Sequence, residues 1–202
     1  MKKIIVYDFD KTLTYKDTLF GFFKFAAKKN IFYSFKLIAL YTSLVFSKFG
    51  LLNNRQLKNI GIQLFLKNLD AAELKKKFSN FHKTITYNKV FNDMKFDENS
   101  TYYIVSASFQ EYLSPIFSNP IHVVGSLIKY KNKKANCLEF NCFEEAKIQA
   151  LNKLNVSKID VLYTDSYSDL ALAKIADKII IVNGDETIIC NNLQEFTQYF
   201  NK

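Results

Sequence analysis

The chain has 202 residues, of which 49% are hydrophobic and 23% are charged, so it is long enough and apolar enough to fold and is not a disordered segment. Its three cysteines are odd in number and form no CxxC pair, which argues against a disulfide framework and against a cysteine-based zinc site. The net charge is +9, and residues 15–98 carry this excess, with 15 Lys or Arg against 6 Asp or Glu.

The segregated positive charge predicts an anionic partner. A basic segment attracts anionic substrates and can adsorb to an anionic membrane surface. No nucleic-acid-binding motif accompanies the charge, so nucleic acid is not expected. The first apolar run ends at Asp8, which argues against a signal peptide, and the cysteines fit a reducing compartment. We therefore expect a cytoplasmic protein, with peripheral contact to the inner membrane as an alternative; the oligomeric state stays open.

The first predicted element is a buried strand at Ile4-Ile5-Val6, which runs into two acids, Asp8 and Asp10. Residues two apart in an extended chain point to the same side, so both carboxylates face one spot. They repel each other there unless a cation lies between them, and oxygen ligands suit a hard cation such as Mg²⁺. The alternative is that the two acids only cap the following segment.

Residues 15–95 predict an all-helical, basic insertion, whose first helix Asp17 can cap. Residues 31–52 are apolar almost all round. Only 11 uncharged residues separate Lys36 from Lys48 in this stretch, which is short of the ~20 that span a bilayer. We expect a helix buried between others there, with a dimer surface or a membrane-interface hairpin as the alternatives.

A second strand is predicted over residues 101–105, and it ends in Ser106 ahead of a helix that Ser108 and Glu111 can cap. At the end of a parallel strand, a hydroxyl group together with backbone N–H groups can bind phosphate, although hydroxyls are common at such positions. Two alternating segments between residues 125 and 141 then predict a β-hairpin.

Further charged residues follow toward the C-terminus. Lys147 lies early in a predicted helix, where a cation opposes the helix dipole, and an ion pair with Glu144 is the structural explanation. A predicted strand over residues 159–163 is followed by Asp165 and Asp169, of which Asp169 can simply cap the next helix.

Taken together, four motifs resemble those of the haloacid dehalogenase-like phosphohydrolases. The string DFDKTLT at residues 8–14 resembles the family's first motif, and the apolar run ending in Ser106 resembles its second. Lys147 matches the third motif, and TDSYSD at residues 164–169 matches the fourth. The order is closest to the phosphoserine-phosphatase-like subfamily, which has a helical cap between the first two motifs and includes a bacterial phosphatidylglycerophosphate phosphatase. Three positions depart from the Gly often found in the family, namely Lys11, Ala107 and Thr164.

The resemblance implies roles for individual residues. Asp8 would be the nucleophile that accepts the phosphoryl group, and Asp10 would be the general acid and base. Lys147 would be catalytic by neutralising the phosphate and the nucleophile, and Asp17 would reach the substrate if it does not only cap its helix. The implied phosphate-binding groups are those of Ser106, Lys147 and the backbone near Phe9 and Asp10. The implied Mg²⁺ ligands are Asp8, Asp10, Asp165 and Asp169, the last through a water unless it orients Lys147.

The resemblance also implies an α/β fold. Residues 1–14 and 96–202 would form a Rossmann-like parallel sheet flanked by helices, and residues 15–95 would form an all-helical cap inserted after the first strand. The implied function is Mg²⁺-dependent hydrolysis of a phosphomonoester through an aspartyl-phosphate on Asp8, with transfer to an acceptor other than water left open. The alternatives are a phospholipid head group at a membrane surface as substrate, as in phosphatidylglycerophosphate, or a non-catalytic module that binds a phosphorylated ligand.

Overall fold

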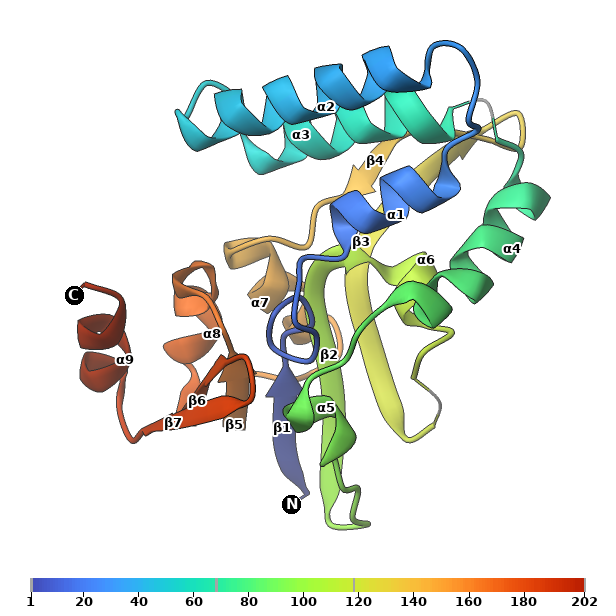
Figure 1. Cartoon of the computed structure of the whole chain (residues 1–202). Helices are drawn as coiled ribbons and strands as arrows, with labels where there is room; N and C mark the ends of the chain where they lie inside the picture. Colours follow the sequence, from blue (N-terminus) through green and yellow to red (C-terminus); the bar gives the residue numbers. More distant parts are fainter. Residues whose placement is uncertain (1, 68, 118, 202) are drawn as a thin grey trace.

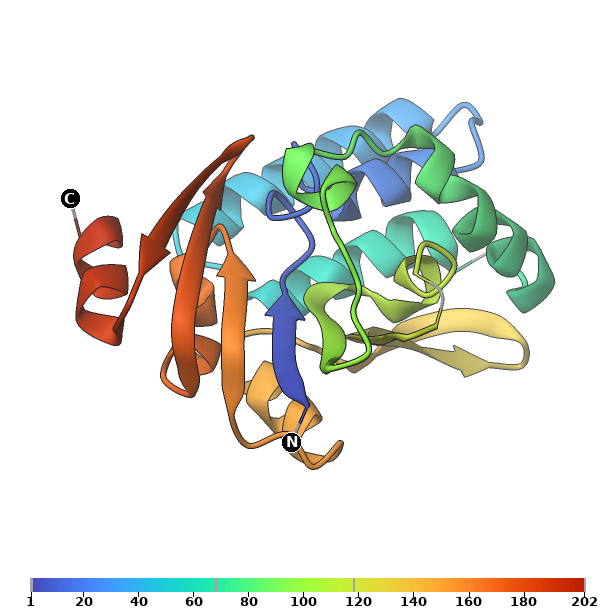
Figure 2. The same ribbon diagram turned by 90° about the horizontal axis from the view of Figure 1, so that it is seen from below.

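The computed structural model describes residues 2–67, 69–117 and 119–201 and contains a seven-stranded sheet of order β4-β3-β2-β1-β5-β6-β7 (Figure 1). Strands β3, β2, β1, β5 and β6 are parallel, whereas the edge strands β4 and β7 pair antiparallel with β3 and β6. Figure 2 shows the dark blue β1 between the green β2 and the orange β5. The strands are β1 (Lys3–Tyr7), β2 (Ser100–Phe109), β3 (Ile121–Lys131), β4 (Lys134–Phe140), β5 (Ile159–Thr164), β6 (Ala176–Asn183) and β7 (Glu186–Cys190).

This mostly parallel sheet with flanking helices confirms the predicted fold class, and β3 with β4 confirms the predicted hairpin. The β-branched residues of the inner strands suit a buried parallel sheet. Successive residues point to opposite faces, so Val6 and Val105 belong to one core cluster, whereas Tyr7 and Ile104 belong to the other. The first cluster is covered by α7 (Glu145–Asn152), α8 (Leu170–Ala173) and α9 (Leu193–Phe200).

The insertion after β1 is helical, as predicted. Its helices are α1 (Leu19–Ala26), α2 (Tyr33–Lys48), α3 (Asn54–Gly61), which continues as a π-helical turn over Ile62–Leu66, and α4 (Ala71–Phe81). Asn53 caps α3 and Asp70 caps α4 by accepting hydrogen bonds from backbone N–H groups. Phe22 of α1 joins the insertion to the core, because its ring lies 4.9 Å from that of Phe78 and 5.1 Å from that of Tyr112.

The prediction of a buried helix within residues 31–52 is wrong for one side of α2. This helix packs on α3 and the π-helical turn, on the far side of α3 from the sheet (Figure 1), so only its inner side is covered. Leu40 and Ser43 are buried there, whereas the side chain of Phe35 is 70% exposed. The local sequence was apolar all round and did not indicate that no further layer covers α2. Within the described residues, no helix is long and apolar enough to cross a bilayer.

The chain returns to the core before residue 95, where the predicted cap ends. Thr86 accepts a hydrogen bond from the backbone N–H of Tyr15, and the Asn88 side chain donates to the carbonyl oxygens of Thr12 and Gly184. The short helix α5 (Lys89–Asn92) therefore lies against the core. The β3–β4 hairpin in turn reaches the insertion, since β4 contacts the π-helical turn after α3.

Gly125 of β3 allows a close approach of two backbones. A Cβ atom at this position would lie 2.7 Å from the backbone nitrogen of Gln110 and 2.8 Å from the carbonyl oxygen of Ser108. We expect Gly125→Ala to lower the free energy of unfolding by about 1–3 kcal/mol, because neither backbone can move away easily. Urea denaturation measures this difference.

Gly21→Ala is the matched control for this substitution. The nearest atom to a Cβ at Gly21 is a ring carbon of Phe81 at 3.6 Å, which is an ordinary contact, and Ala favours the helix α1. Its free energy of unfolding should be unchanged or higher by up to ~1 kcal/mol. Equal stability of Gly125→Ala and the unsubstituted chain would contradict the close approach.

Candidate active site

The sheet brings the predicted site residues together at the C-terminal ends of its central strands, where open α/β sheets bind ligands. Asp8 and Asp10 follow β1, Ser106 lies late in β2, and Asp165 follows β5. These side chains, with Lys147 of α7 and Asp17 of the insertion, line one cleft of about 160 Å³. Asp169 does not line the cleft but contacts Lys147 beside it.

Lys147 is the buried cation of the site. Its ammonium nitrogen lies 2.8 Å from Asp8 Oδ1 and 2.5 Å from Asp169 Oδ1, and only 2% of the residue is exposed. Burial by itself lowers the pKa of this ammonium, but the two carboxylates outweigh it and hold the pKa above the ordinary lysine value. The Lys147 side chain is thus committed to these two acids, and the alternative of a surface pair with Glu144 does not describe it.

Asp169 is held in place by its neighbours. Its second carboxylate oxygen accepts a hydrogen bond of 2.7 Å from the hydroxyl of Thr164, while the first accepts from Lys147. Both oxygens therefore have partners within the protein. This arrangement suits a residue that orients Lys147, and it leaves Asp169 little freedom to bind a cation directly.

Asp10 is surrounded by hydrogen-bond donors from two different parts of the chain. One oxygen accepts from the backbone N–H of Thr18 at 2.7 Å and from its hydroxyl at 2.6 Å, and the other accepts from the hydroxyl of Ser108. Burial and the nearby Asp17 raise the pKa of Asp10 to about 6, although the hydrogen bonds oppose this shift. A carboxyl group with such a pKa can both donate and accept a proton near neutral pH.

Asp8 and Asp165 are the carboxylates of the site whose negative charge is incompletely compensated. Burial raises the pKa of each to about 7, and the negative charges of Asp8 and Asp169 add to the shift of Asp165. Lys147 opposes the shift of Asp8, and Lys11, which also lines the cleft, opposes that of Asp165, but both pKa values stay raised. The site therefore favours an additional cation, and its donors are oxygen atoms, which suit Mg²⁺.

The number of acids also fits Mg²⁺. Among the described residues, no three His, Cys, Asp or Glu side chains form a group that could enclose a metal. Mg²⁺ is commonly held by one or two carboxylates and completes its shell with water and substrate phosphate. Asp8 and Asp165, on neighbouring strands and in one cleft, can provide such a pair.

Ser106 and Phe9 differ in what they can offer a phosphate group. Ser106 lines the cleft, and its hydroxyl accepts a hydrogen bond from the backbone N–H of Ser108 at 3.1 Å. The Phe9 ring is fully buried and packs edge-on against Phe117, so only the backbone of Phe9 can face the cleft.

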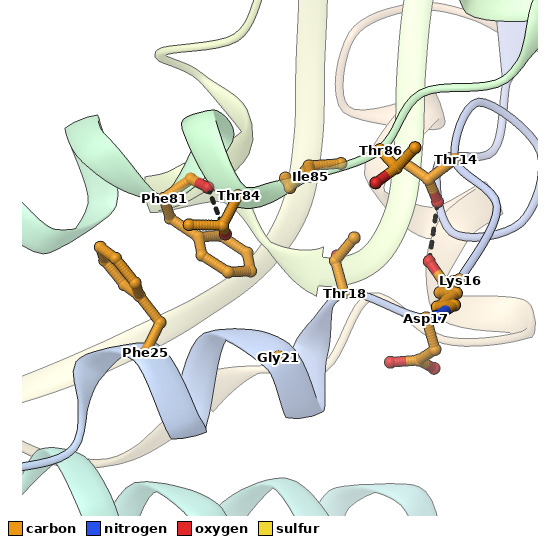
Figure 3. A pocket seen from close by; sticks show the side chains of 10 residues that line it. All are labelled: Thr14, Lys16, Asp17, Thr18, Gly21, Phe25, Phe81, Thr84, Ile85 and Thr86. Atoms are coloured by element: carbon orange, nitrogen blue, oxygen red, sulfur yellow. Dashed lines mark hydrogen bonds between the residues drawn. The ribbon is translucent and has the colours of Figure 1, made fainter.

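Asp17 lies just before α1 and faces the cleft. Its carboxylate accepts from the backbone N–H of Leu19 at 3.0 Å, but the N-cap of α1 is Thr18, and no side chain caps this helix as Asp17 was predicted to do. Asp17 also lines a second cavity of about 380 Å³, bounded by α1 on one side and by residues 84–86 on the other (Figure 3). Its walls combine hydroxyl groups with the rings of Phe25 and Phe81, so a partly apolar group can enter there.

Ser108 does not cap the following helix, contrary to the prediction from sequence. The helix α6 (Gln110–Leu113) has no side-chain cap, and the Ser108 hydroxyl donates to Asp10 instead. Glu111 is likewise not part of a capping box, since it accepts from the backbone N–H of Ile128. The contact between Ser108 and Asp10 joins residues 98 positions apart, so no local pattern could reveal it.

The buried position of Lys58 was not predicted from sequence either, although its place in a stripe of buried residues indicated it. It occupies the first position of an i, i+3, i+4, i+7 stripe whose other members, Gly61, Ile62 and Phe65, are buried. Its ammonium donates to the carbonyl oxygen of Ala107 at 2.5 Å, to Ser126 Oγ at 3.0 Å and to Asn141 Oδ1 at 2.7 Å. Burial lowers the pKa of Lys58 to about 7.

Comparisons with known proteins agree with this arrangement. The family model described as haloacid dehalogenase-like hydrolase matches residues 5–174. A protein of unknown function from Bordetella pertussis Tohama I aligns over 100% of this chain and 97% of its own, with a TM-score of 0.73 and 16% identity. No curated protein sequence matches the chain.

Two solved structures of phosphoserine phosphatase are also similar. A substrate-bound complex has a TM-score of 0.58 and 18% identity, and a phospho-aspartyl intermediate analogue has a TM-score of 0.55 and 17% identity. Each alignment covers 98% of both chains. At these identities the likeness concerns the fold.

The raised pKa values of Asp8 and Asp165 predict how stability depends on pH. Without metal, the folded protein binds more protons than the unfolded chain between about pH 4 and pH 7, because both pKa values lie above 3.8 in the folded state. The free energy of unfolding should therefore fall as pH rises through this window. Adding Mg²⁺ should raise the melting temperature by roughly several degrees at pH 7 and by less at pH 5, where protons compete for the carboxylates.

Thermal unfolding in chelator and in excess Mg²⁺ measures both effects. Asp165→Asn should flatten the pH dependence and reduce the Mg²⁺ effect, whereas Asp177→Asn, which changes an exposed acid paired with Lys158, should leave both unchanged. An equal Mg²⁺ effect in Asp165→Asn and the unsubstituted chain would exclude Asp165 as a ligand.

Proposed function

Because this chain belongs to the haloacid dehalogenase-like hydrolases, we propose that it is a Mg²⁺-dependent phosphatase that hydrolyses a phosphomonoester through an aspartyl-phosphate on Asp8. One observation carries the proposal. Asp8 lies with Lys147, Asp10 and Asp165 around one cleft, so a nucleophile, its counter-charge, a proton carrier and a second acid surround one small space.

The nucleophile is oriented by its ion pair. Oδ1 of Asp8 is bound to Lys147, so Oδ2 is the oxygen that attacks the phosphorus atom, and the bond from phosphorus to the ester oxygen breaks. Mg²⁺ bound by Asp8 and Asp165, with Asp10 and Asp169 nearby, would offset the negative charge of the phosphate and of the attacking carboxylate. Ser106 and the backbone near Phe9 and Asp10 would donate hydrogen bonds to the phosphoryl oxygens.

Proton transfer falls to Asp10. In its protonated form it gives its proton to the departing ester oxygen, and in its charged form it takes a proton from the water that hydrolyses the aspartyl-phosphate. The pKa of about 6 supports both tasks, since neither form is rare near neutral pH. Transfer of the phosphoryl group to an acceptor other than water would use the same residues.

For the substrate, the main proposal is a small phosphomonoester. Its leaving group would extend from the cleft past Asp17 into the cavity of about 380 Å³, which is large enough for a small organic group. The insertion from α1 to α4 would act as the cap over the phosphate, whereas the last residues of the predicted range 15–95 lie against the core. The second candidate is a phospholipid head group at the inner membrane surface, and the exposed apolar side of α2 favours it. A non-catalytic phospho-ligand module has less support, because Asp8, Asp10, Lys147 and Asp165 are all present.

Asp8→Asn should abolish phosphate release, with a loss of at least about a thousandfold, because an amide oxygen is a far poorer nucleophile than a carboxylate. The measurement is Mg²⁺-dependent phosphate release from phosphoserine, sugar phosphates, nucleotides and micellar phosphatidylglycerophosphate. The folded state is checked by circular dichroism. Asp177→Asn, a change of an exposed acid on β6 that pairs with Lys158, serves as the control and should retain activity. Normal turnover by Asp8→Asn would exclude the proposed intermediate.

Ser108→Ala tests the role of Asp10. The Ser108 hydroxyl lowers the pKa of the Asp10 carboxyl, so its removal should raise that pKa. The alkaline limb of the pH profile of kcat/KM, where Asp10 loses its proton, should then move to higher pH, and kcat at neutral pH should fall by roughly tenfold. The exposed Ser34→Ala is the control. A pH profile that does not move would argue that another group carries the proton.

A further inference from the structure

The outer face of α2 is a continuous apolar surface on the outside of the molecule. We define it by six exposed side chains, those of Phe35, Ile38 and Val45 on the helix and those of Ile31, Phe32 and Phe49 just beyond its two ends. Most of these follow one another at intervals of three or four residues, so they gather on one side of the helix. The exposed fraction reaches 84% for Ile31 and 78% for Phe49. Apolar surfaces of this size on a folded protein mark an interaction site.

The inner side of the same helix is apolar too. Leu40 is fully buried there, and Tyr33 and Leu37 pack against the core. Ser43 is also buried, and its hydroxyl donates within the helix to the carbonyl oxygen of Ala39. A surface helix normally directs an apolar side to the core and a polar side to water, so the exposed second apolar side of α2 is unusual.

The chain segment that contains this face carries only positive charge. From Thr18 to Leu69 the sequence contains eight Lys or Arg and no Asp or Glu. Lys29, just before the face begins, and Lys48, in the last turn of α2, are both exposed. Cations therefore lie at both ends of the apolar strip.

We propose that the outer face of α2 docks on the surface of an anionic lipid bilayer, with the helix axis along the membrane plane. Apolar side chains enter the boundary between head groups and acyl chains, and the lysines meet the anionic head groups. A second copy of the chain is a poorer partner, because a twofold pairing of this face would set lysines against lysines without any acid to balance them.

The docking face adjoins the cleft. Phe49 and Leu51, which is 69% exposed, lie in the turn between α2 and α3, and Asn54 at the start of α3 lines the cleft with Asp8. A docked molecule would hold the mouth of the cleft near the head groups. Provided that the proposed phosphatase function holds, docking would favour the second of the two candidate substrates, a phosphomonoester on a lipid.

Vesicle flotation tests the docking directly. The full chain should float with vesicles that contain phosphatidylglycerol and remain behind with vesicles of phosphatidylcholine alone, and high salt should weaken its binding. The double variant Phe35→Ser with Phe49→Ser should bind roughly tenfold more weakly or worse. Ile188→Ser with Ile189→Ser, which changes two exposed residues of β7, is the matched control and should bind like the unsubstituted chain.

The charge contribution has its own pair of variants. Lys29→Gln with Lys48→Gln should weaken binding several-fold and reduce its salt dependence. The control is Lys174→Gln with Lys153→Gln, which changes two exposed lysines outside the helical insertion and should alter neither property. If the aromatic variant fails to fold by circular dichroism, Ile38→Ser with Val45→Ser replaces it.

Failure of the docking and failure of the phosphatase proposal give different results. Asp8→Asn should float like the unsubstituted chain, and the α2 variants should retain hydrolysis of a soluble phosphomonoester. Docking is refuted if the unsubstituted chain does not float with phosphatidylglycerol vesicles, or if the α2 variants float equally well. It is also refuted if the chain is a dimer in solution that Phe35→Ser with Phe49→Ser converts to a monomer without altering flotation.

Discussion

The ion pairs of Lys147 with Asp8 and Asp169 are the constraint on which the site depends. They join α7 to the end of β1 and to the turn after β5, and Lys147 and Asp169 are almost wholly buried. Removing Lys147 would leave two buried carboxylates without this compensation, which costs several kcal/mol, so the three elements hold one another in register. The same pairs fix which oxygen of Asp8 is bound to Lys147, and they commit Lys147 to Asp8 and Asp169, so the pKa of Asp165 stays raised and the cleft favours a cation.

Asp10 depends on both halves of the molecule. Its donors are Thr18, at the start of the helical insertion, and Ser108, at the end of β2 in the core. The hydroxyl of Thr18 also contacts that of Tyr112 at 2.9 Å, and Tyr112 packs against Phe22 of α1. The electrostatic environment of one carboxyl group is therefore set by how the insertion rests on the sheet, and the aromatic cluster around Phe22 keeps that arrangement rigid.

The strands and the gathering of the acids could be predicted from sequence, because β-branched runs that end in Asp or Ser recur and parallel strands end at one edge of a sheet. The covering of α2 could not, since an apolar helix has the same pattern whether or not another layer lies over it. Ser108 and Lys58 show a second limit. Their partners lie 98 and 49 positions away, so their roles depend on pairings that no local pattern contains.

Lys58 also restricts how the insertion can move. Its ammonium is inserted into the core beside Ala107, where three acceptors hold it and only 1% of the residue is exposed. If the base of α3 swung away as a rigid lid, all three hydrogen bonds would break at once. The insertion is thus tethered at its centre, and a widening of the entrance that keeps these bonds must pivot about Lys58, with the tip of the α2–α3 hairpin travelling furthest.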